Sequence, residues 1–179
     1  MKNKSTAFTE TDLQGFLDEM IDHDRLALAD RLQRASERLA DYAPLVAAGH
    51  GQGGASGTGS ASWSAHEVLA HIVVLSKFYG VIFHKVSSGK MTELALLNNV
   101  GLRDAMDEQM AQIEPKELIR MALEDHARTI KGLRAADAAS MRRVVKVDGK
   151  ETMTAEEVAR LPLISHLELH IDQLARALA

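Results

Sequence analysis

The sequence predicts an all-α fold, an antiparallel four-helix bundle with short extra helical segments in its connections. Three observations support this prediction. Apolar residues recur at helical spacing through most of the 179 residues. Aromatic residues make up only 4% of the chain, so residues that favour strands are sparse. Ser or Thr stands three residues before Glu at two expected helix starts. The length and the 46% apolar content fit one domain, residues 1–179, with a single core.

The first helix is expected over residues 11–48. Leu28 and Leu32 belong to its apolar line, and Pro44 is expected to kink or end it. Residues 49–61 are rich in Gly and Ser and cannot bury apolar area, so we expect them to form a flexible loop.

The second helix has a well-defined predicted start. Ser64 and Glu67 have the spacing of a capping box, in which each side chain satisfies a free backbone donor at the helix start. Gly89 is a plausible end. His71 borders an apolar stripe that we expect to face the core, formed by Val68, Ile72, Leu75, Tyr79, Ile82 and Val86.

The segment that follows is expected to connect two helices. Residues 94–113 are predicted to be partly helical, and Pro115 fits the first position of a third helix that continues to Ala136. Residues 141–147 give the one β-branched run, which ends at the turn-like pair Asp148 and Gly149.

The last helix is expected over residues 163–178. Thr154 and Glu157 predict a short helical lead-in, and Pro162 is expected to interrupt it and to begin the new helix.

Two histidines in the last helix suggest a metal site. His166 and His170 are four residues apart, so they differ by about 40° around a helix and by roughly 6 Å along it, and both rings can reach one ion. A third nitrogen from another helix would complete a set of ligands, and three protein ligands leave one position open for water or substrate. The plainer interpretation is that each histidine is a half-buried side chain bonded to a carbonyl. The sequence H-L-E-L-H is not the H-E-x-x-H of metalloproteases, and Glu168 lies about 100° from His170.

Other residues are weaker candidates. His126, and His23 with Asp24, are either hydrogen-bond partners of a ligating histidine or ordinary interior and boundary residues. Trp63 is expected to pack the entrance of the second helix, or else to touch a ligand at the mouth of a site. We expect no functional partner for three surface histidines, His50, His66 and His84.

The order and spacing of a few positions resemble the DinB-like superfamily. This superfamily includes the metal-binding domain of the mycothiol-dependent maleylpyruvate isomerases and the bacillithiol transferases. The matching positions are Trp63-x3-Glu67-x3-His71, the region of Asn98, and His166-x3-His170-x2-Gln173.

The resemblance implies a four-helix bundle that binds a divalent metal, usually zinc or nickel. Its ligands would be His71, His166 and His170, and its cosubstrate would be a low-molecular-weight thiol. The isomerase pattern has Glu where this sequence has His166. We therefore expect a thiol S-transferase rather than an isomerase. The resemblance also implies a homodimer.

Two alternatives remain open from the sequence. Water at the open metal position would make the protein a metal-dependent hydrolase. The bundle is otherwise a non-catalytic stress-response or small-molecule-binding protein, for which the eight methionines and many alanines would suit an adaptable pocket.

Composition limits the kinds of molecule that the protein is expected to bind. The formal charge is −4 without a basic run, which disfavours nucleic acid. The absence of cysteine excludes a thiolate ligand, so any thiol must come from outside. The polar start and the lack of a long uninterrupted apolar run disfavour a membrane span or a signal peptide. We expect a cytoplasmic protein that acts on a small molecule.

Overall fold

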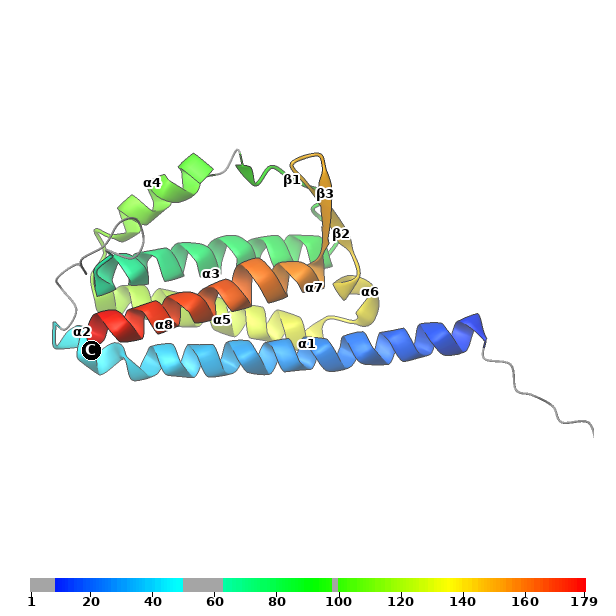
Figure 1. The fold of residues 1–179 in the computed structure, drawn as a ribbon, viewed down its shortest axis with the longest axis horizontal. Helices are drawn as coiled ribbons and strands as arrows, with labels where there is room; N and C mark the ends of the chain where they lie inside the picture. The colour runs from blue at the N-terminus through cyan, green and yellow to red at the C-terminus, as the bar shows by residue number, and fades with distance from the viewer. Residues whose placement is uncertain (1–8, 50–62, 98–99) are drawn as a thin grey trace, which may run out of the picture.

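The computed structural model describes residues 9–49, 63–97 and 100–179, with the backbone alone for 100–104 (Figure 1). His50, Asn98 and nearly all of the predicted loop 49–61 lie outside these ranges. Three helices of the bundle are α1 (Glu10–Asp41), α3 (Ala65–Ser87) and α5 (Pro115–Ala135). The fourth is a continuous helix that consists of α7 (Ala155–Val158), a π-helical segment η3 (Ala159–Ser165) and α8 (His166–Leu178). The connections contain α2 (Ala43–Ala47), α4 (Val100–Met110), α6 (Ala138–Met141) and the strands β1 (Glu93–Leu94), β2 (Val144–Val147) and β3 (Glu151–Thr154). The all-α prediction is confirmed.

The direction of each helix follows from its connection. The chain returns along the bundle through α4, so α3 and α5 run parallel, while α1 runs antiparallel to α5 (Figure 1). Two close approaches fix the α3–α5 register. A Cβ on Gly80 would lie 2.9 Å from Thr129 Oγ1, and one on Gly132 would lie 3.3 Å from a ring carbon of Phe83. Glycine therefore allows these two helices to approach closely.

The predicted helix boundaries are largely confirmed. Ser64 and Glu67 form the expected capping box at the start of α3. Thr9 and Asp12 make an equivalent box at the start of α1. The first helix ends at Asp41, earlier than predicted, and Pro44 occupies the first turn of the separate helix α2.

A small sheet covers one end of the bundle. Strand β2 pairs with β1 in parallel and with β3 in antiparallel orientation. The sequence predicted only the central strand, and placed its start too early because Ala138–Met141 forms α6. The predicted turn is confirmed, since Asp148 and Gly149 have φ values of 49° and 72° and Lys150 N donates to Val147 O.

The prediction that a new helix begins at Pro162 is wrong. Residues 155–178 are continuously helical, and Pro162 lies inside the π-helical segment η3. Proline lacks the N–H of a helical hydrogen bond, and a wider turn accommodates it without a break. Ser165 Oγ donates to Arg160 O at 2.8 Å within this segment. The helix therefore carries His166 and His170 along the bundle instead of starting afresh.

Helix α3 is more apolar than the sequence analysis suggested. It is the one described helix with the length and hydropathy of a membrane span, and 61% of the apolar window is buried within the protein. It packs against both α5 and α8. Its apolar character is therefore accounted for by its place in the core.

Candidate metal centre

Three imidazoles from two helices converge at one point of the bundle. His71 lies near the start of α3, and His166 and His170 lie on α8. One ring nitrogen of each lies within 4.8 Å of the others. The ring centroid of His170 is 4.6 Å from that of His71 and 4.7 Å from that of His166. The structure thus brings together the three residues that the sequence analysis singled out.

Polar partners orient two of these rings. His71 Nδ1 lies 2.9 Å from Asp107 Oδ2, and His170 Nδ1 lies 2.9 Å from Gln173 Oε1. Both partner atoms are acceptors, so each Nδ1 carries the proton and donates it. The Nε2 lone pair of each ring is then free to coordinate a cation. A ligating histidine typically has this pattern.

The spacing of the nitrogens suits a shared ion. His170 Nε2 and His166 Nε2 are 2.9 Å apart. Because His170 Nε2 is an acceptor, this contact needs either a proton on His166 Nε2 or a cation between the two atoms. Zinc–nitrogen bonds of about 2.0–2.1 Å place two tetrahedral ligands about 3.3 Å apart. The donor set therefore fits a divalent ion after small ring rotations.

Burial keeps the central ring neutral. The pKa of His170 is lowered to about 4, chiefly by desolvation and in smaller part by the rings of His71 and His166, while Gln173 and Asp107 act in the opposite direction. Only a neutral imidazole has the lone pair that a metal needs. At neutral pH His170 is thus ready to bind an ion without first losing a proton.

Trp63 borders the site. Its ring centroid lies 5.0 Å from that of His71, and it stacks on His170 at 6.1 Å with 19° between the planes. It also packs against the hydrophobic core at the entrance to α3. The expectation that Trp63 packs the helix entrance is confirmed, and contact with a bound ligand stays a prediction.

A solved structure shares this architecture. The mycothiol-dependent maleylpyruvate isomerase matches with a TM-score of 0.61 and 17% sequence identity, over 82% of this chain. This chain has the DinB-like fold. It spans 60% of the length of that isomerase. No family model and no curated protein sequence matches the chain.

Asp107 is the site residue that the sequence analysis missed. It lies on α4, which crosses the DinB-like bundle in a segment expected only to connect two helices. Its Oδ2 accepts from His71, while its buried Oδ1 has no hydrogen-bond partner among the described residues. The chain has 25 acidic residues, and no spacing distinguishes this one. Gln173, by contrast, was part of the motif that carried the resemblance.

The remaining histidines lie outside the cluster. His126 is buried and bonds to hydroxyl groups, and His23 is exposed, so neither orients a ring of the cluster. His66 was expected at the surface without a partner, which is wrong: it is half-buried, and its Nε2 lies 2.7 Å from Ile113 O. His84 is exposed, as expected.

Proposed function

We propose that this protein binds one divalent metal and uses it to transfer a low-molecular-weight thiol to a small electrophilic molecule. The observation that carries the proposal is the convergence of three imidazole nitrogens within 4.8 Å. His71, His166 and His170 would hold the ion, and imidazole suits both zinc and nickel.

The chemistry follows from the charge of this donor set. Three neutral ligands leave the dipositive charge uncompensated, so the ion would acidify a thiol or water bound at its open position. Asp107 and Gln173 would keep the His71 and His170 rings in place through their Nδ1 protons, and the carboxylate would make His71 a better donor. His71 keeps 21% of its side-chain surface exposed to solvent.

The proposed reaction is a nucleophilic substitution at carbon. The thiol sulfur forms a bond to the electrophilic carbon, the leaving group departs with the electron pair of its bond, and the thiol proton passes to solvent. The sulfur must come from a separate molecule, because the chain has no cysteine. The name of the structurally similar isomerase, which includes dependence on mycothiol, supports a thiol over water at the site.

The test is a thiol-consumption assay with the metal as a variable. The protein is stripped with chelator, reloaded with zinc or nickel, and supplied with several thiols and a chromogenic haloarene. We expect turnover only with both metal and thiol, and its loss in His170→Ala. The matched control is His126→Ala, which removes a buried histidine that lies outside the cluster.

Each other outcome favours a different class. Turnover of an ester without any thiol would favour the metal-dependent hydrolase. Full metal loading with no turnover for any thiol would contradict the transferase and favour a binding protein.

A further inference from the structure

The N-terminal part of α1 presents an apolar stripe to solvent. This part, residues 10–22, is called the arm below, and it projects past the end of the bundle (Figure 1). The stripe lies on one face of the helix, and its members keep 41–56% of their surface exposed: Leu13, Phe16, Leu17 and Met20. Asp18, on roughly the opposite face, pairs with Arg142. That pair holds the arm to the bundle by one face and leaves the stripe facing outward.

The arm is strongly acidic. It contains no Lys or Arg, and its five acidic residues are Glu10, Asp12, Asp18, Glu19 and Asp22. At 100° per residue, Glu10 borders one edge of the stripe, while Asp12 and Glu19 border the other. The arm is therefore an amphipathic helix whose apolar face has negative borders.

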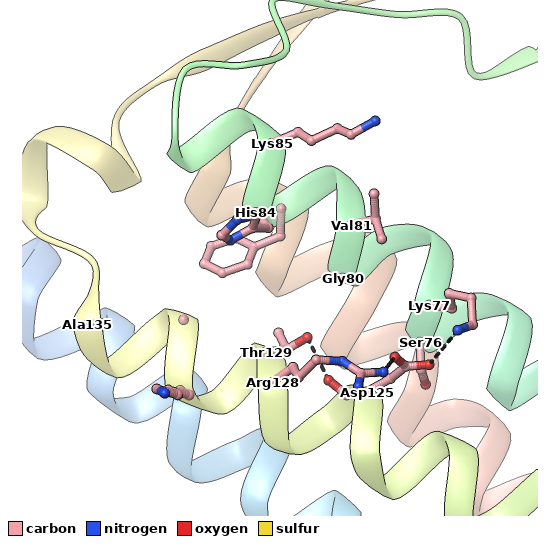
Figure 2. A pocket seen from close by; sticks show the side chains of 13 residues that line it. Ser76, Lys77, Gly80, Val81, His84, Lys85, Asp125, Arg128, Thr129 and Ala135 are labelled. Carbon is pink, nitrogen blue, oxygen red and sulfur yellow. Dashed lines mark hydrogen bonds and ion pairs between the residues drawn. The ribbon is translucent and has the colours of Figure 1, made fainter.

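A groove between α3 and α5 has the complementary chemistry (Figure 2). Its volume is about 520 Å³, and apolar atoms of Val81, Phe83 and Ala135 contribute to its lining. Gly80 and Gly132 also line it, at the positions where α3 and α5 approach most closely.

Basic side chains surround this groove. They are Lys77, Lys85, Arg128 and Lys131, with His84 beside them. The one acidic residue of the lining, Asp125, is already paired with Arg128 and lies 3.7 Å from Lys77 Nζ. Lys85 and Lys131 are exposed, and neither forms an ion pair with any residue in the described part of the chain.

We propose that the arm of a second copy of this chain occupies the groove, and that two copies exchange arms reciprocally. The apolar stripe would fill the groove between α3 and α5, and the acidic borders would meet the basic rim. The arm cannot reach its own groove, because α1 is one uninterrupted helix from Glu10 to Asp41.

The positions of arm and groove favour reciprocal exchange. Arg25, just after the arm, donates to Leu133 O and Arg134 O, near the groove residue Ala135. Both surfaces therefore lie at one end of the bundle, and His71 lies near the other end of α3. Two contacts related by a twofold axis close into a dimer, whereas a single head-to-tail contact would extend into a chain. The interface is independent of the metal.

The test measures self-association of the full chain by sedimentation velocity over a range of concentrations. Phe16→Glu disables the arm and Val81→Glu disables the groove, and both positions are exposed enough to keep the fold. We expect the wild type to be a dimer and each variant to dissociate at least about 30-fold more readily. The matched control is Leu161→Glu, because Leu161 has the same 56% exposure as Phe16 and belongs to η3, so it is part of neither the arm nor the groove lining. It should remain dimeric. Far-ultraviolet circular dichroism and thermal unfolding would check that each variant is folded.

Mixing the two disabled variants separates arm exchange from other dimers. The Val81→Glu protein retains its arm and the Phe16→Glu protein retains its groove, so the mixture should form a heterodimer through one intact contact. Higher salt should weaken it. A monomeric wild type at 100 µM or above would overturn the proposal. So would folded variants that stay dimeric, or a mixture that fails to associate, since the last result indicates α1–α1 or groove–groove pairing.

Discussion

Two buried histidines in this bundle share a low pKa but differ in what surrounds their ring nitrogens. His170 and His126 are 5% and 1% exposed, and desolvation lowers the pKa of each to about 4. The ring of His126 lies between two hydroxyl groups, with Nε2 2.8 Å from Ser76 Oγ and Nδ1 3.2 Å from Ser36 Oγ. Both of its nitrogens are satisfied within the protein.

The His170 ring has a partner for only one of its nitrogens outside the cluster. Its Nδ1 bonds to Gln173, but its Nε2 faces the nitrogens of His71 and His166. Burial and a low pKa therefore do not identify a binding site. A candidate site is indicated instead by several nitrogen lone pairs that converge at one point without enough N–H groups to satisfy them.

Removing a ligand should give the largest effect. His166→Ala and His170→Ala are expected to weaken metal binding by more than about 100-fold, beyond the effect typical of an outer partner. His126→Ala should leave the metal content unchanged. Metal analysis after dialysis against a fixed free-ion concentration measures this. Equal metal content in all three variants would remove the distinction between the two environments.

For the stability of the metal-free protein, His126 is the residue whose removal should have the large effect. His126→Ala leaves a cavity, and the buried hydroxyl of Ser76 and the half-buried hydroxyl of Ser36 each lose a partner, so it should lower the free energy of unfolding by about 2–4 kcal/mol. His23→Ala removes an exposed imidazole and should change it by less than about 0.5 kcal/mol. Urea unfolding of the chelator-treated proteins gives both values. Similar losses in the two variants would contradict a structural role for the hydroxyl-bonded ring.

Asp107→Asn tests the partner that orients His71. An amide oxygen can still accept from Nδ1, but the charge is lost, so metal affinity should fall about 10- to 100-fold. The neighbouring exposed residue provides the control, since Glu108→Gln removes the same charge without contact to the cluster. Isothermal titration with zinc compares the two. Equal affinities would show that Asp107 acts only through net charge or not at all.

The pH dependence of stability should be the smallest effect, when it is expressed per pH unit for each histidine. In the metal-free protein the unfolded histidines gain protons as the pH falls below about 6.5, while folded His126 and His170 stay neutral down to about 4. Stability should therefore be full above pH 6.5 and decline toward pH 4, by at most about 1.4 kcal/mol per pH unit for each residue. Urea midpoints between these pH values check the slope. His126→Gln should halve it, and an unchanged slope would contradict the assigned pKa.

The fold and the three imidazoles were accessible from the sequence for physical reasons. Apolar residues at helical spacing place the core faces, and four-residue spacing puts His166 and His170 on one side of a helix. The wide turn around Pro162 was not accessible, because no local pattern distinguishes a π-helical segment from a helix break. Strand β1 is two residues long, too short to show a period, and β3 has the sequence Glu-Thr-Met-Thr, with one apolar residue and no alternation.

Asp107 was hidden for a different reason. Its role depends on how α4 crosses the bundle, which is a long-range property of the fold. The same holds for the arm and the groove, because their complementarity appears only when exposure is known at residues such as Phe16 and Val81.

An anomalous-difference map of crystals grown with zinc would test the metal centre most directly. We predict one strong peak about 2.0–2.1 Å from a ring nitrogen of each of His71, His166 and His170, with His126 bare. No peak at this point, or a peak bound by fewer than two of the three rings, would contradict the assignment.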